Sequence, residues 1–310
     1  MKNNNIKGSF FLCLAALIWG LAFVAQSAAA DYVPPFLTNC LRSIISAIFL
    51  YAVYKIRNRK NHAHIIPSDP AARKTVLSGG LICGIMLAIS TNFQQFGIAF
   101  YPEGSAAEAH AGFITALYVI LVPLFSLFIG KKPSASIWAA VAVSLIGFYL
   151  LCFSGGLDGI YLGDLLIMIC AVAFSFHILS VDAFVDKLGG LRLSILQFLV
   201  CSAISGVLSL IFEFSQISLQ NLITAAPQIL YLGIVSSGIG YTLQIIGQRY
   251  ADPSVSSLSM SLESVFAALG GWIISGNALK SNEIWGCTLV FAAIVLAQLP
   301  PIRFKKLSKA

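Results

Sequence analysis

Long apolar stretches separated by short polar connections fill this chain of 310 residues. A helix that crosses a bilayer needs about 20 predominantly apolar residues. Most connections leave room only for a turn, so consecutive helices are expected to run antiparallel. The pattern predicts ten membrane-spanning helices, at residues 8–30, 35–55, 75–100, 105–129, 136–153, 163–184, 193–212, 226–247, 254–274 and 283–302.

The composition agrees with a lipid environment. Hydrophobic residues make up 58% of the chain and charged residues 10%, whereas a typical soluble domain is about 45–50% apolar and about 25% charged. A soluble core of this size could not bury so much apolar surface. The composition therefore predicts an all-α membrane protein and argues against a cytosolic enzyme, a nucleic-acid-binding protein and a disulfide-rich secreted module.

The positive charges predict the orientation of the helices. Lys and Arg concentrate in loops on the cytoplasmic side of a membrane. With both termini in the cytoplasm, all of the 19 Lys and Arg residues except Arg42 and Lys280 fall on that side. The net charge of +7 is therefore interpreted as an orientation signal and not as a sign of an acidic ligand.

The two halves of the chain resemble each other. Residues 8–24 (GSFFLCLAALIWGLAFV) are similar to residues 163–179 (GDLLIMICAVAFSFHIL), which divides the chain into repeats at 1–153 and 160–305. Each repeat holds five spans, an odd number, so the second repeat should enter the membrane from the opposite side. Inverted repeats of this kind build secondary transporters, which bind substrate near the midplane between the repeats.

A signal peptide is the alternative interpretation of the first span, because Ala28-Ala29-Ala30 resembles a signal-peptidase site. The length of the apolar stretch and its internal counterpart at 163–179 favour a retained helix.

Four segments resemble the EamA family of the drug/metabolite transporter superfamily: Leu17–Phe23 (LIWGLAF), Gly112–Pro123 (GFITALYVILVP), Leu162–Leu166 (LGDLL) and Ser261–Leu269 (SLESVFAAL). The resemblance covers nearly the whole chain. It implies a ten-helix carrier of the bacterial inner membrane that exports small metabolites such as amino acids, with spans five and ten at the periphery. Ser264 and Asn277 depart from the family pattern, which often has Pro and Glu at these places.

Two ionisable residues stand out, because charged side chains inside a bilayer are costly and usually functional. Glu263 lies near the middle of the ninth span and is a candidate to carry a proton or to meet a substrate amine. Arg42, in the second span, is a candidate to hold a substrate carboxylate through two parallel hydrogen bonds. The alternative for both is a structural bond between helices, and for Arg42 that includes an ion pair with Glu263 or Glu108.

Further polar and aromatic side chains share the helix faces that would surround a central cavity. The candidates are Trp19, Phe23, Gln26, Gln94, Tyr241, Gln244 and Ser259, with Glu108 near one end of the fourth span and His177 deep in the sixth. Aromatic walls with a few amides suit a small amphipathic metabolite. The alternative for each is packing, because aromatic residues fill helix bundles, and Gln and His often bridge helices.

Motifs for metal or nucleotide chemistry do not occur in the sequence. Its seven cysteines form no Cys-x-x-Cys, and it has neither His-Glu-x-x-His nor Gly-x-x-x-x-Gly-Lys-Ser/Thr. We therefore expect no cofactor, no metal and no enzymatic activity.

The function that the sequence favours is secondary active export of a small metabolite by alternating access. The expected partners are an amino acid or another amphipathic small molecule, membrane lipid and, as the candidate coupling ion, a proton, with no nucleic acid. Two alternatives stay open, a membrane-embedded enzyme that modifies lipid and a non-transporting scaffold or sensor.

Overall fold

The computed structural model describes residues 5–59, 64–102, 107–152, 161–275 and 281–298, and these residues form helices without any strand. The elements, in order, are α1 (Asn5–Ala30), α2 (Pro35–Arg57), α3 (Pro70–Ala99), α4 (Ala107–Thr115), α5 (Tyr118–Phe128), α6 (Ala135–Cys152), α7 (Leu162–Leu188), α8 (Gly190–Phe212), the 3₁₀ turn η1 (Phe214–Gln216), α9 (Leu219–Thr224), α10 (Ala226–Leu230), the π-helix η2 (Tyr231–Gly240), α11 (Tyr241–Tyr250), α12 (Pro253–Met260), α13 (Leu262–Ser275) and α14 (Ser281–Gln298).

Ten apolar segments match the ten predicted spans. Seven helical segments are long and apolar enough to cross a membrane, and α6 and α14 contain shorter apolar helices at Ala135–Leu150 and Ile284–Ala297. The remaining span consists of α12 and α13, which are separated at Ser261. The predicted all-α membrane fold with ten spans is therefore confirmed.

Three of the ten spans are interrupted near their middle. The fourth breaks between α4 and α5, the eighth passes through η2, and the ninth breaks at Ser261. At the two breaks the backbone bonds shorten to i→i−3, as from Leu117 to Ile114 (3.1 Å) and from Ser264 to Ser261 (3.3 Å). Such interruptions are tolerated at membrane depth only where protein surrounds them.

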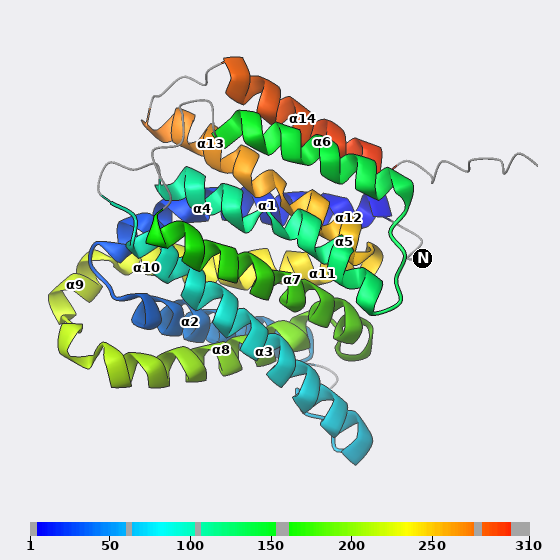
Figure 1. Cartoon of the computed structure of the whole chain (residues 1–310). Helices are drawn as coiled ribbons and strands as arrows, with labels where there is room; N and C mark the ends of the chain where they lie inside the picture. Colours follow the sequence, from blue (N-terminus) through cyan, green and yellow to red (C-terminus); the bar gives the residue numbers. More distant parts are fainter. Residues whose placement is uncertain (1–4, 60–63, 103–106, 153–160, 276–280, 299–310) are drawn as a thin grey trace, which may run out of the picture.

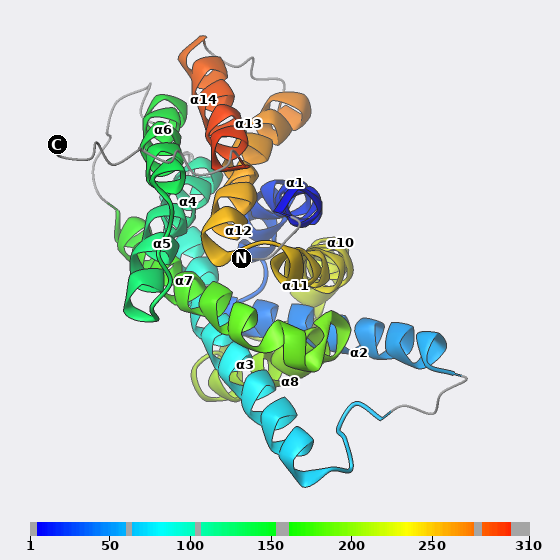
Figure 2. The same cartoon turned by 90° about the vertical axis from the view of Figure 1, so that its right-hand side faces the viewer.

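The helices form one bundle in which α6 and α14 pack against each other along one edge (Figure 1). This is the peripheral place that the family resemblance implies for spans five and ten. On the other side, α2 packs against α8, and α3 against both α7 and α8. Helix α1 lies between these groups, where it contacts η2, α11 and α13 (Figure 2).

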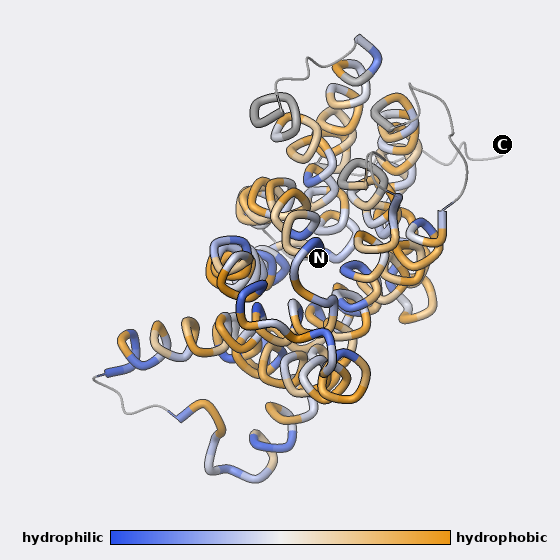
Figure 3. Tube along the Cα trace, turned by 90° about the vertical axis from the view of Figure 1, so that its left-hand side faces the viewer, coloured by the Kyte–Doolittle hydropathy of each residue, from blue (hydrophilic) through white to orange (hydrophobic). Residues whose placement is uncertain are grey.

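Basic residues gather at one end of the bundle. Lys131 forms an ion pair with Asp182 there, and Arg249 lies 3.6 Å from Asp186. The end of α2 and the beginning of α3 extend past the other helices at this end (Figure 2). Along the helices hydrophobic positions dominate, and hydrophilic ones concentrate towards the ends and loops (Figure 3), as a bilayer requires.

A buried carboxylate fixes the opposite end of the bundle. Pro34 precedes the first turn of α2 and provides no side-chain hydrogen bond to cap it. Glu213, directly after α8, accepts hydrogen bonds from the amides of Phe36 (2.9 Å) and Leu37 (2.8 Å). A carboxylate at a helix N-terminus satisfies amides that have no partner within the helix. The end of α8 is therefore tied to the beginning of α2.

Small residues allow α3 and α8 to approach closely. A Cβ atom on Gly80 would lie 2.6 Å from the Cβ of Leu196, and one on Gly84 would lie 2.5 Å from the Cβ of Val200. The Gly-x-x-x-Gly pattern at 80–84 therefore serves packing inside the chain, which is the usual role of small residues between membrane helices.

Gly84→Ala is expected to destabilise the protein by about 1–3 kcal/mol, because the new methyl group would have to push α3 away from α8. Gly112→Ala is the matched control, since its Cβ would meet Phe23 only at an ordinary distance of 3.6 Å. Thermal unfolding in detergent measures both variants. Equal melting temperatures for the two would contradict the packing role of Gly84.

Candidate functional site

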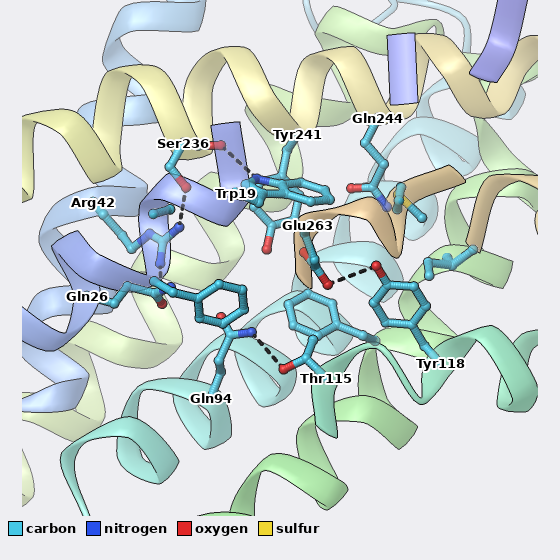
Figure 4. Close-up of a pocket in the computed structure, with 15 residues that line it drawn as sticks. Trp19, Gln26, Arg42, Gln94, Thr115, Tyr118, Ser236, Tyr241, Gln244 and Glu263 are labelled. Atoms are coloured by element: carbon cyan, nitrogen blue, oxygen red, sulfur yellow. Dashed lines mark hydrogen bonds between the residues drawn. The ribbon is translucent and has the colours of Figure 1, made fainter. Parts of the chain in front are cut away.

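A pocket lies at the centre of the bundle, where the two halves of the chain meet (Figure 4). Residues of α1 to α5 and residues of α7, η2 and α11 to α13 line it together. The lining residues are Trp19, Ala22, Phe23, Gln26, Arg42, Gln94, Thr115 and Tyr118 from the first half, and Phe174, Ile178, Ser236, Tyr241, Gln244, Met260 and Glu263 from the second.

The pocket is narrow in this conformation. Its cavity volume is only about 30 Å³. That is room for a few waters, whereas a site that encloses a small ligand usually has 300–1,000 Å³. Side chains or helices therefore have to move before a metabolite can enter.

Arg42 reaches one side of the pocket from α2. Its Nε donates to Ser237 Oγ (2.9 Å), one terminal nitrogen donates to Gln26 Oε1 (3.1 Å) and the other donates to Ser236 Oγ (3.1 Å). All three acceptors are uncharged, and only 4% of the Arg42 surface is exposed. The guanidinium is thus buried with good hydrogen bonds, and no carboxylate among the described residues pairs with it.

Glu263 enters the pocket in the first turn of α13, directly after the break in the ninth span. Its carboxylate accepts a hydrogen bond of 2.9 Å from Tyr118 Oη. Tyr118 itself begins α5, directly after the break in the fourth span. The two interrupted spans therefore meet through this bond. Irregular backbone of this kind in corresponding spans is typical of transporter binding sites.

Aromatic rings close the pocket between these two charged groups. The rings of Trp19 and Tyr241 are in contact, with centroids 4.8 Å apart. Trp19 Nε1 donates to the backbone carbonyl of Ser236 (3.1 Å), and Phe198 packs edge-on against Tyr241 from behind, at 5.5 Å. Aromatic walls of this kind can accept an apolar body or a cation.

The structure brings eight of the predicted site residues together around this pocket, namely Trp19, Phe23, Gln26, Arg42, Gln94, Tyr241, Gln244 and Glu263. Gln94 donates to Thr115 Oγ1 (3.3 Å). The side-chain oxygen Oε1 of Gln244 is buried and has no hydrogen-bond partner among the described residues, so a molecule in the pocket that Gln244 lines could donate to it.

The other three predicted residues are placed differently. His177 is buried behind the pocket wall, within 3.0 Å of Gln197 Oε1. Ser259 donates to Ser9 Oγ (2.8 Å), which joins α12 to α1 away from the pocket lining. The side chain of Glu108 lies outside the described residues.

Sequence reasoning did not single out Thr115, Tyr118, Ser236 and Met260 as pocket residues. Thr115 ends α4 and Tyr118 begins α5, so the break in the fourth span places both side chains, and regular helical spacing does not predict it. In the described part of the chain, no group of three or more His, Cys, Asp or Glu side chains could hold a metal ion.

The Tyr118–Glu263 bond can be tested by a double-mutant cycle. Tyr118→Phe and Glu263→Ala each remove this bond and should each lower stability, and the double variant should lose about 1–3 kcal/mol less than the sum of the two losses. Thermal unfolding in detergent measures the cycle. Tyr51→Phe, on an exposed tyrosine, is the control. Strictly additive losses would show that the two side chains do not interact.

Comparison with known proteins places the chain in a family. The model of the EamA-like transporter family matches residues 6–153 and 161–299. An uncharacterized transporter of Archaeoglobus fulgidus (strain ATCC 49558 / DSM 4304 / JCM 9628 / NBRC 100126 / VC-16) is 25% identical over 292 residues, 93% of this chain and 84% of that protein. The uncharacterized transporter YoaV of Bacillus subtilis (strain 168) is 19% identical over 298 residues, 94% of this chain and 96% of that protein.

A solved crystal structure shares the fold, with a TM-score of 0.74 at 22% sequence identity over 94% of this chain and 96% of that chain. The family match spans both halves, the helices are those of a multi-pass membrane protein, and the central pocket lies between the halves. The chain therefore belongs to the EamA-like transporter family and is a membrane transporter of a small molecule.

Proposed function

We propose that the protein is a secondary active transporter that exports small metabolites such as amino acids. It works by alternating access between two inverted five-helix repeats, residues 1–153 and 160–305. The observation that carries this proposal is the central pocket, whose walls come from both repeats and hold one cation, Arg42, and one carboxylate, Glu263. A binding site shared between repeats changes its access when one repeat moves against the other.

An amino acid matches the chemistry of this pocket. Its carboxylate fits a guanidinium, its ammonium fits a carboxylate or an aromatic face, and its side chain fits the walls around Trp19 and Tyr241. The three interrupted spans border the pocket, and such discontinuities are places where a helix can bend. We infer that they let the narrow pocket widen when substrate binds.

We also propose that the protein lies in the inner membrane of a bacterial cell with both termini in the cytoplasm. The cluster of basic residues at one end of the bundle supports this orientation, because Lys and Arg favour cytoplasmic loops. The direction of transport, outward, rests on the family resemblance alone.

A non-transporting scaffold or sensor is the second candidate. It is supported by one observation, the small space for water in the pocket, because a scaffold needs no cavity. Flux separates the two candidates directly.

Purified protein in liposomes is expected to move at least one amino acid across the membrane, faster with a pH gradient than without it. Uptake or release of radiolabelled amino acids, one at a time, measures this, with protein-free liposomes as the control. If no amino acid crosses in either direction under either condition, the proposed function is wrong and the scaffold becomes the better description.

Glu263→Gln is expected to abolish transport or to remove its dependence on the pH gradient, because the variant keeps the shape of the side chain but can neither carry a charge nor exchange a proton. Initial flux rates measure the effect, and gel filtration checks folding. Glu213→Gln is the matched control, since Glu213 is an equally buried carboxylate that caps α2 outside the pocket. Wild-type flux and pH dependence in Glu263→Gln would exclude Glu263 from the mechanism.

A further inference from the structure

We propose that Arg42 binds a carboxylate group of the transported molecule, which takes the places of Gln26 Oε1 and Ser236 Oγ, while Ser237 holds the guanidinium from behind as a positioning residue. This inference rests on the proposed function and names the chemical group that the same pocket recognises. Three observations carry it: the charge balance around Arg42, the division of its acceptors, and the π-helix that supplies two of them.

The first observation is that no carboxylate among the described residues compensates the charge of Arg42. An arginine side chain has five N–H groups, and three hydrogen bonds to neutral acceptors are formed here. Two N–H groups thus have no acceptor among the described residues. Burying a cation without a partner of opposite charge is costly, so the site is poised for an anion that arrives from outside the chain.

The second observation is that the three acceptors fall into two classes. Gln26 and Ser236 line the pocket together with Arg42, whereas Ser237 does not. Ser237 bonds Nε, and the two pocket-lining acceptors bond the two terminal nitrogens. A carboxylate binds a guanidinium through two parallel N–H···O bonds. The two oxygens of one carboxylate, which share a negative charge, would therefore replace the two neutral acceptors. The bond from Arg42 to Ser237 would be kept.

The third observation is the geometry of the eighth span. Consecutive residues of an α-helix point about 100° apart, and the wider turns of a π-helix reduce this angle, which favours contact of two neighbouring serines with Arg42. The wide π-turns of η2 present both Ser236 and Ser237 to it. Close approach is possible because Gly233 faces α2, where a Cβ atom would lie 2.7 Å from Ile45. The residues of η2 thus supply two of the three hydrogen-bond acceptors of the Arg42 guanidinium.

If a carboxylate displaced Gln26 and Ser236 from Arg42, contacts outside the pocket would also be affected. The backbone carbonyl of Ser236 accepts the indole N–H of Trp19, and the backbone carbonyl of Gln26 accepts from Gln95 Nε2 (3.1 Å). Arg42 therefore bridges α1, α2 and η2. A carboxylate that takes over its terminal nitrogens would loosen contacts between the first repeat and the second.

Binding and flux can be measured separately with three matched mixtures. One contains the protein amino acids, the second the amines left when their carboxyl groups are removed, and the third the carboxylic acids left when their α-amino groups are removed. Both carboxylate-bearing mixtures are expected to raise the melting temperature of the detergent-solubilised protein, and by more than the amines do. Stabilisation by the amines equal to that by the acids would overturn the inference.

Arg42→Gln is expected to weaken the binding of carboxylates by about 100-fold, because it removes the charged half of a buried pair. Arg42→Lys keeps the charge but not the paired N–H groups, so its affinity for carboxylates should lie between those of the wild type and of Arg42→Gln. Arg249→Gln, on an exposed arginine that pairs with Asp186, is the matched control. Undiminished carboxylate binding by folded Arg42→Gln would also overturn the inference.

The two neighbouring serines give a sharper test, because Ser236→Ala and Ser237→Ala remove the same atom from adjacent positions. Ser237→Ala should weaken carboxylate binding by about fivefold, with recovery in Ser237→Thr, whereas Ser236→Ala should strengthen it by a similar factor by removing a competing acceptor. A purely structural role would change stability without altering the preference for acids over amines. Equal effects of both alanines would contradict the division between displaced and positioning acceptors.

Flux of the same mixtures in liposomes separates this inference from the proposed function. Carboxylate binding that depends on Arg42, without any flux, would leave the binding site in place and overturn transport. Flux of amines that Arg42→Gln does not change would support transport and overturn the carboxylate site. Flux of carboxylate-bearing compounds that is lost in Arg42→Gln would support both.

Discussion

The constraint on which this structure depends is that lipid offers no hydrogen bonds to a peptide backbone. Every span therefore has to be helical wherever lipid surrounds it. The breaks at Leu117 and Ser261 lie next to pocket residues, and η2 contributes Ser236 to the pocket while its Ile239 is exposed on the outer face. The irregular backbone of these three spans thus lies beside the site, where it shapes the binding surface.

Hydrophobic patterning could predict the ten spans because burial in lipid affects every residue of a helix in the same way. It could not predict where the spans break, since Ala116, Leu117 and Ser261 are compatible with a regular helix. It also began the third span at residue 75, whereas α3 begins at Pro70. Asp69 caps that helix by accepting from the Ala72 amide (2.8 Å), so the helix continues past its apolar stretch.

Which site residues could be predicted also depended on whether their backbone is regular or irregular. Trp19, Phe23 and Gln26 could be predicted because they share one face of an unbroken helix, and all three line the pocket. Ser237, Tyr241 and Gln244 also share an α-helical face, but Ser236 does not, and it meets Arg42 from within the π-helix. Tyr118 was missed because its partner, Glu263, is 145 positions away in the sequence, and no local pattern connects them.

The π-helix has a consequence for how this chain tolerates changes of length. A π-helix holds more residues per turn than an α-helix, so η2 stores surplus chain inside a membrane span. Deletion of one residue from it could be absorbed by a return to α-helical turns, without shortening the span by more than about 1.5 Å. The residues beyond the deletion would then face nearly the same way as before, because the lost residue was the surplus that the wider turns held. The change would fall on η2 itself, which presents Ser236 and Ser237 to Arg42, so a deletion that the fold could accommodate would still remove this part of the pocket wall.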